Sequence, residues 1–256
     1  MNKKASELSL KNTHFESPHG LDSDNHYTTA YELALLTNYA LNNSTFAKIV
    51  GTKNYTITIN GYPKTLNNTN ELLGNLDGVY GVKTGFTNGA NRCLVTSCKR
   101  NNMDIICVVL GADTKNFRTM DSIKLIEYCF KNFEYLDAKK ILTENFEEWR
   151  NNNLNSFYID KGISNNLSIS ITPLDTPLIP IKKDLKNSIS TKININTKLL
   201  APIYEGTIIG DINIMCNDEI LLKTNLIASN TIYKKNIHNY MIEFFKRYPS
   251  LLENFI

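Results

Sequence analysis

The residues of this 256-residue chain best suited to chemistry by type and spacing are Lys83, Thr84 and Gly85. A lysine ammonium can pair with a carboxylate, and a neighbouring threonine hydroxyl can hydrogen-bond to the same group. Glycine has no Cβ, so a ligand backbone can approach it closely. Apolar, strand-like runs follow at residues 93–97 and 105–110. They predict that the tripeptide heads a hairpin whose edge strand lines a cleft. A glycine turn beside a surface lysine is the alternative interpretation.

The composition excludes several classes of function. With 42% hydrophobic and 21% charged residues the chain is typical of a folded globular protein. A net charge of +3 without a dense Lys/Arg cluster argues against a nucleic-acid partner. The five cysteines form no CxxC pair, and His14, His19 and His26 lie in a loop-like stretch without helical spacing. We therefore expect no metal site and no cofactor.

The elements that must position the tripeptide are predicted from periodicity. Thr28 or Thr29 is suited to cap a helix over residues 30–41. Residues 55–59 and 62–66 alternate as strands around Asn60-Gly61, a strong hairpin signal. Residues 118–133 are predicted to form a helix, and together these elements favour an α/β (α+β) domain over residues 1–135. The broad buried face expected on the helix of residues 118–133 consists of Met120, Ile123, Leu125, Ile126, Tyr128, Cys129 and Phe130.

The composition shifts after residue 135. Short Ile/Leu/Thr alternations at 167–171, 189–195, 208–214 and 220–227 predict a small all-β domain over residues 136–230, a sandwich or a barrel. The tail, residues 231–256, is predicted to contain an amphipathic helix over 232–248. Such a basic amphipathic helix either lies on a membrane surface or docks on its own domain.

Several segments in the same order carry a family resemblance. Residues 13–22 (THFESPHGLD), 26–34 (HYTTAYELA), 83–87 (KTGFT), 108–112 (VVLGA) and 201–210 (APIYEGTIIG) resemble those of serine-type D-alanyl-D-alanine carboxypeptidases. These are the low-molecular-mass penicillin-binding proteins, which trim peptidoglycan stem peptides. The resemblance implies part of a penicillin-binding, β-lactamase-like transpeptidase domain, followed by a small all-β domain and a C-terminal amphipathic helix.

The resemblance also implies the site and its ligands. In the family a Ser-x-x-Lys serine attacks the peptide carbonyl, and a Ser-x-Asn motif supports proton transfer. By resemblance Lys83 and Thr84 hold the substrate, and the Phe86 N–H belongs to an oxyanion hole. Arg118 would meet the terminal carboxylate; otherwise it is a solvated residue at a helix start. The ligands implied are peptidoglycan pentapeptides ending in D-Ala-D-Ala and, for the intact parent, β-lactams. The substrate-binding residues predicted on this basis are Lys83, Thr84, Gly85, Phe86, Thr87 and Arg118.

The catalytic half of that site is missing from the sequence. None of the lysines has a serine three residues before it, so neither the nucleophile nor its base is present. Ser23-Asp24-Asn25 spells the second motif, but it lies only 60 residues before Lys83 and is not expected to be catalytic. We expect a chain truncated at its N-terminus and inactive alone. The parent would be extracytoplasmic and peripheral to the membrane, whereas this chain, lacking a signal peptide, would remain cytoplasmic.

Two other functions fit the sequence. A non-catalytic cell-wall or membrane-associated binding module would use the β-rich domain and the tail. A β-lactamase-like hydrolase would share the Lys-Thr-Gly tripeptide but leave the second domain unexplained.

Overall fold

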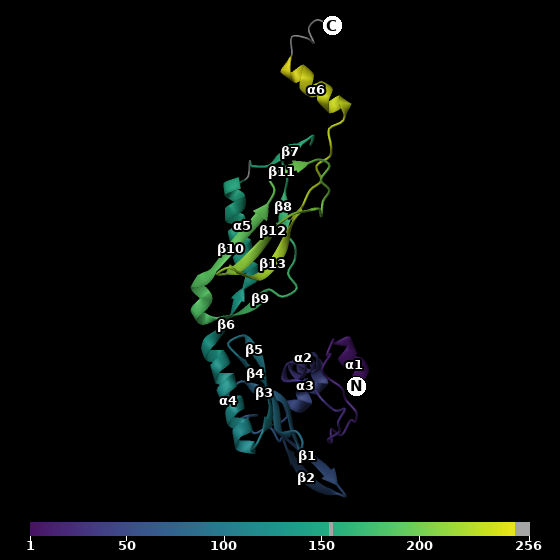
Figure 1. Cartoon of the computed structure of the whole chain (residues 1–256), viewed down its shortest axis with the longest axis vertical. Coiled ribbons are helices and arrows are strands. Elements are labelled where there is room, and N and C mark those ends of the chain that lie inside the picture. The colour runs from purple at the N-terminus through teal and green to yellow at the C-terminus, as the bar shows by residue number, and fades with distance from the viewer. Residues whose placement is uncertain (154–155, 249–256) are drawn as a thin grey trace. The chain divides into compact units, whose positions relative to one another are not determined.

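The computed structural model describes residues 1–153 and 156–248 and divides into two compact units, Met1–Phe133 and Glu134–Ile256. The first unit combines helices with antiparallel strands, and strands dominate the second (Figure 1). The predicted fold class, an α/β unit followed by a β-rich domain and a short C-terminal helix, is confirmed.

The tripeptide lies on an edge strand of the first unit. β3 (Val79–Thr87), β4 (Asn91–Arg100) and β5 (Met103–Ala112) form an antiparallel sheet in the order β3-β4-β5. Lys83 pairs with Val95, and Thr84 pairs with Leu94. Residues 94–98 of the central strand are all buried, which requires cover on both faces of the sheet. One long edge of β3 has no strand partner among the described residues, as the sequence predicts.

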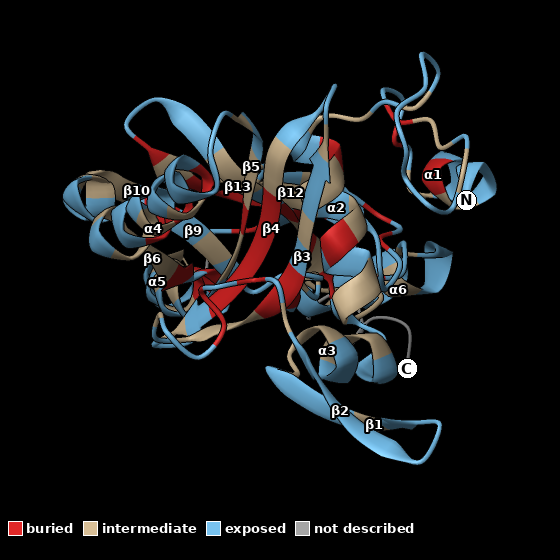
Figure 2. Ribbon diagram, turned by 90° about the horizontal axis from the view of Figure 1, so that it is seen from below, coloured by how far each residue is buried: buried red, intermediate tan, exposed pale blue. Residues whose placement is uncertain are grey.

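Helices cover the two faces of this sheet. α2 (Ala30–Leu41) and α3 (Ser44–Val50) lie on one face, and α4 (Lys115–Asn132) lies on the other (Figures 1 and 2). A short helix, α1 (Asn2–Glu7), precedes them. The Thr29 side chain accepts a hydrogen bond from the Glu32 N–H at 3.2 Å, and Thr114 accepts one from Phe117 at 3.1 Å. These caps satisfy N–H groups that have no partner within the helix. The predicted helix over residues 30–41 and its cap are confirmed.

The hairpin predicted around Asn60-Gly61 is present. β1 (Asn54–Ile59) pairs with β2 (Tyr62–Asn67), and Ile59 lies opposite Tyr62. Asn60 and Gly61 have φ angles of 51° and 82°. Such left-handed conformations at both central residues are what a two-residue hairpin turn requires, and Asn and Gly adopt them at the lowest cost.

The broad buried face predicted for residues 118–133 is wrong in part. The buried residues of α4 are Arg118, Ser122 and Ile126, which recur every fourth position along one stripe. Met120 and Leu125 are 44% and 46% exposed. The reason is geometric: the helix touches the sheet along one side, so apolar residues that point away from that side remain in solvent. Tyr128 is likewise exposed.

The second unit is built on a four-stranded antiparallel sheet in the order β10-β12-β13-β8. Its strands are β8 (Ile169–Ile171), β10 (Ile189–Ile195), β12 (Ile208–Cys216) and β13 (Glu219–Ala228), all within the predicted segments or a few residues longer. The smaller elements are the paired β6 (Phe133–Asp137) and β9 (Leu178–Lys182), the paired β7 (Tyr158–Asp160) and β11 (Lys198–Leu200), and the 3₁₀ helix η1 (Lys183–Ser188).

Helix α5 (Ala138–Asn153) supplies part of the core of this unit and was not predicted. Its Leu142 and Phe146 are buried together with Ile212 and Leu226 of the sheet. The other faces of the helix are strongly charged. The strand-like segments that follow from residue 167 led us to predict an all-β domain for the whole region. The second unit is therefore a sheet covered by a helix, rather than strands alone.

The C-terminal helix is shorter than predicted. α6 spans Ile237–Arg247 and begins after Asn236, whose side chain accepts a hydrogen bond from the Asn239 N–H at 3.0 Å. Ile232 lies before the helix, is 3% exposed and forms a β-bridge with Ile203. The prediction of a helix from residue 232 is wrong because that residue belongs to the sheet core. Residues 249–256 lie outside the described residues. Over residues 1–153 and 156–248, no helix is long and apolar enough to cross a membrane.

Candidate functional site

A groove of about 1570 Å³ in the first unit borders the edge strand β3. The loop of residues 15–28, the segment 67–71 after β2, the β3–β4 hairpin and the first turn of α4 contribute its walls. It is therefore assembled from segments far apart in the sequence. All six predicted substrate-binding residues line it: Lys83, Thr84, Gly85, Phe86, Thr87 and Arg118.

The segment after β2 is fastened to β3. The hydroxyl oxygens of Thr69 and Thr84 lie 2.6 Å apart, a hydrogen-bond distance. The Asn70 amide donates to the Gly81 carbonyl at 2.8 Å, and Asn70 is only 2% exposed. The Lys83 ammonium donates to the carbonyl of Thr84, while its side chain remains exposed to the groove. Thr69 therefore orients the Thr84 hydroxyl, a role that no local sequence signal indicated.

Asp22, from the loop before α2, also lines the groove and contacts the turn after β3. Its carboxylate accepts a hydrogen bond from the Gly89 N–H at 3.0 Å. The Thr87 hydroxyl and this N–H hold the pKa of the Asp22 carboxyl below its usual value. The Arg92 guanidinium stacks on the Phe86 ring, with 3.6 Å between its Cζ and the ring centroid. The loop before α2 therefore fixes the turn that follows the Lys-Thr-Gly tripeptide.

The literal Ser-x-Asn sequence belongs to this same loop. Ser23 and Asp24 line the groove, and the Ser23 hydroxyl donates to the Glu16 carboxylate. This serine is thus engaged by an acid from its own loop.

Arg118 is the buried cation of the groove. It is 3% exposed, so the interpretation of a solvated residue at the helix start is wrong. Its burial follows from its place on the stripe of α4 that faces the sheet. Nε and Nη2 have no hydrogen-bond partner among the described residues. Buried polar groups rarely lack partners, and a planar guanidinium with free N–H groups is well suited to bind a carboxylate.

Glu71, from the segment after β2, lies beside Arg118 and is paired with Lys115 of α4. The Oε2 atom of Glu71 lies 3.6 Å from Arg118 Nη2, close enough for an ion pair but beyond hydrogen-bond distance. Oε1 of Glu71 lies 2.5 Å from the Lys115 ammonium. The hydrogen bond from Lys115, assisted by one from Thr119, lowers the pKa of the Glu71 carboxyl. Glu71 was not among the predicted site residues, since nothing near it in the sequence pointed to α4.

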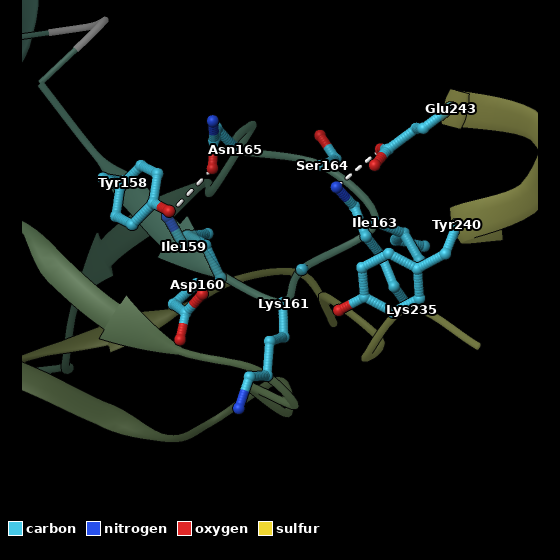
Figure 3. Close-up of a pocket in the computed structure, with 11 residues that line it drawn as sticks. Tyr158, Ile159, Asp160, Lys161, Ile163, Ser164, Asn165, Lys235, Tyr240 and Glu243 are labelled. Atoms are coloured by element: carbon cyan, nitrogen blue, oxygen red, sulfur yellow. Dashed lines mark hydrogen bonds and ion pairs between the residues drawn. The ribbon is translucent and has the colours of Figure 1, made fainter. Parts of the chain in front are cut away.

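A smaller hollow of about 390 Å³ lies in the second unit, beside α6 (Figure 3). Asp160, Lys161 and Asn165 line one side of it, and Asn165 accepts a hydrogen bond from the Ile159 N–H at 2.9 Å. Lys235 and Glu243 form an ion pair of 2.5 Å on the other side. No motif from the sequence falls here, and the ion pair holds α6 against the segment that precedes it.

Two family models match the chain. Residues 1–114 match the family described as D-alanyl-D-alanine carboxypeptidase. Residues 155–234 match the family described as penicillin-binding protein 5, C-terminal domain.

Curated proteins and solved structures agree with these families. The D-alanyl-D-alanine carboxypeptidase DacF of Bacillus subtilis is 32% identical over 96% of this chain and 60% of its own length. For DacA of Escherichia coli the identity is 30% over 96% of this chain and 58% of its own length. The crystal structure of penicillin-binding protein 5 from Haemophilus influenzae has a TM-score of 0.67 and 27% identity, covering 91% of this chain and 64% of that one. The chain thus spans about 60% of the length of the curated relatives it matches.

Proposed function

The chain is a relative of the D-alanyl-D-alanine carboxypeptidases, and we propose that its groove binds the D-alanyl-D-alanine end of peptidoglycan stem peptides. The observation that carries this proposal is Arg118, a buried arginine with unused donors on the same groove as Lys83 and Thr84. Arg118, Lys83 and the positioned Thr84 hydroxyl line a space large enough for a peptide terminus. This arrangement favours a ligand with a carboxylate at its end.

The roles follow from the geometry. Arg118 binds the terminal carboxylate of the ligand. The Thr84 hydroxyl, which Thr69 orients, donates a hydrogen bond to the ligand. Lys83 adds a positive charge to the groove. A Cβ at Gly85 would meet only the Cys93 Cβ, at an ordinary 3.6 Å. The protein itself therefore has room for a side chain at this position, and close approach of a ligand explains the glycine.

We expect the chain to bind the ligand along β3 and α4 but not to form an acyl-enzyme with it. Acyl transfer in this family needs the serine of a Ser-x-x-Lys motif, and no lysine of this sequence has a serine three residues before it. A β-lactamase-like hydrolase would account for the groove but not for residues 155–234, which match a penicillin-binding protein domain.

Binding is tested by titrating the ¹⁵N-labelled chain with N-acetyl-D-Ala-D-Ala and following backbone amide shifts. We expect the amides of residues 83–87 on β3 to shift, because that strand borders the groove. The matched control ligand is the C-terminal amide of the same peptide, which lacks the negative charge and should bind at least ~10-fold more weakly.

Equal shifts with the amide would contradict a carboxylate site. Fluorescent penicillin should leave no covalent label on the chain after denaturing electrophoresis. A labelled band would show that the chain contains a reactive nucleophile, and the proposal of binding without acylation would be wrong.

Helix α6 supports a second proposal, that it attaches the chain to an anionic membrane surface. All residues of α6 are exposed or half-buried, among them Ile237 at 81%, Met241 at 53% and Phe244 at 49%. Four Lys/Arg residues and a single acidic one occur over residues 232–248. An unpacked apolar face with basic flanks fits the interface of a bilayer rich in anionic lipid.

Replacing Phe244 by aspartate is expected to reduce binding to vesicles of phosphatidylglycerol by at least ~5-fold, since it places a charge on the apolar face. Co-sedimentation measures the bound fraction. The control is Ile208→Asp, an exposed apolar position of β12, which should bind like wild type. Equal loss in both variants, or no binding by wild type, would contradict a membrane role for α6.

A further inference from the structure

Glu71, Lys115 and Arg118 line the groove close to one another, and Thr119 hydrogen-bonds to Glu71. We propose that Glu71 sets the affinity of the groove for its carboxylate ligand by competing with that ligand for Arg118. The inference rests on the proposed function, because it assumes that Arg118 receives the ligand. Glu71 would be a further residue of the site, in addition to Lys83, Thr84 and Gly85 on β3 and Arg118 on α4.

The position of Glu71 is fixed by its neighbours in the chain. Asn70 and Leu72 are 2% and 3% exposed. The Leu72 N–H donates to the Asn70 side-chain oxygen at 3.1 Å, and the Asn70 amide holds the Gly81 carbonyl of β3 at 2.8 Å. The backbone at Glu71 is thus anchored on both sides, and its carboxylate is directed toward α4.

Both carboxylate oxygens of Glu71 are engaged by other groups. Oε1 meets Lys115 at 2.5 Å, and Oε2 accepts from the Thr119 hydroxyl at 3.1 Å. At 3.6 Å from Nη2, Glu71 therefore leaves the N–H groups of Arg118 free but lowers the positive potential around them. A ligand carboxylate that docks on Arg118 must approach this like charge.

Lys115 decides how strongly Glu71 competes. The hydrogen bond with the Lys115 ammonium helps to hold the Glu71 carboxylate 3.6 Å from Arg118 Nη2, just beyond hydrogen-bond distance. Without Lys115 the carboxylate is free to turn and bond directly to the guanidinium. Lys115 therefore keeps Arg118 available to the ligand, although it does not itself have to touch the ligand.

The test compares three variants in the titration with N-acetyl-D-Ala-D-Ala and its C-terminal amide. Glu71→Gln should bind the carboxylate ligand about three- to tenfold more tightly than wild type, since an unfavourable neighbouring charge is removed. Lys115→Gln should bind it more weakly. The double variant has the same net charge as wild type, yet it should still bind more tightly, because no competitor for Arg118 remains.

The matched control is Glu127→Gln, which removes an acid of the same unit that pairs with Arg100 at 2.8 Å away from the groove. Its affinity should equal that of wild type. Wild-type binding with unchanged or weaker binding by Glu71→Gln would overturn this inference while leaving the proposed function intact. If the double variant bound with the wild-type affinity, net charge alone would explain the effect of Glu71→Gln, and the proposed competition for Arg118 would be wrong. If wild type bound the carboxylate ligand no more tightly than its amide, both this inference and the proposed function would be wrong.

Discussion

Replacing Arg118 by methionine is expected to abolish the preference for a peptide carboxylate and, at the same time, to stabilise the first unit. Arg118 is 3% exposed, and two of its guanidinium nitrogens have no hydrogen-bond partner among the described residues. Its burial has a desolvation cost that the acid at 3.6 Å only partly offsets. A well-packed methionine removes that cost, so the free energy of unfolding should rise by about 1–3 kcal/mol.

This opposite pair of effects distinguishes a binding residue from a structural one. Denaturation followed by far-UV circular dichroism, alongside Trp149 fluorescence, separates the two units, because Trp149 is the only tryptophan and lies in the second. Affinity comes from the titration with N-acetyl-D-Ala-D-Ala, which should weaken at least ~10-fold.

The matched control is Arg100→Met. Arg100 donates to both carboxylate oxygens of Glu127, at 3.1 and 2.8 Å, and to the Asp77 carbonyl at 2.9 Å. Its donors are thus well used, and its loss should destabilise the first unit without affecting ligand affinity. If Arg118→Met destabilised the unit as Arg100→Met does, Arg118 would be a structural ion-pair partner of Glu71 rather than a group kept free for a ligand.

Local chemistry made much of the first unit predictable. A threonine cap with an apolar period of 3.6 places α2, and Asn60-Gly61 closes the β1–β2 hairpin. The edge strand with Lys83-Thr84-Gly85 follows from the apolar runs after it. Each of these features depends on residues within about one turn or one strand of each other, which a sequence displays directly.

The rest of the site depends on contacts between distant segments. Thr69 meets Thr84, and Glu71 meets Lys115 and Arg118, although these partners are 15 to 47 positions apart in the sequence. No period or spacing marks such pairs. The burial of Arg118 was missed for a related reason: a charged residue at a helix start is usually solvated, and only the packing of α4 on the sheet reverses this expectation.

The errors in the second unit have a different physical origin. Helix α5 is amphipathic, with a buried stripe of Ala138, Leu142 and Phe146 among many charged residues, but the strand signals that follow it led the whole region to be interpreted as β-rich. Ile232 continues the apolar pattern of α6 in sequence, yet it is drawn into the core through its bridge to Ile203. Tertiary burial overrode local amphipathicity at that boundary. The stability of the second unit should therefore depend on the sheet core more than on α6.

Truncating Ile212 to alanine tests that dependence and should cost the second unit about 2–5 kcal/mol, a large share of the stability of an ordinary domain. Ile212 is 0% exposed on β12 and packs among Leu142, Phe146 and Leu226, so the lost methyl groups leave a cavity. Urea unfolding followed by Trp149 fluorescence measures the loss, because Trp149 packs against this cluster. Ile208→Ala is the control on the same strand: at 62% exposure it should shift the midpoint little. A comparable loss of stability in both variants would mean that the face of the sheet carrying Ile212 is not the core of this unit. A loss in Ile212→Ala alone would show that apolar side chains buried between α5 and the sheet stabilise the unit.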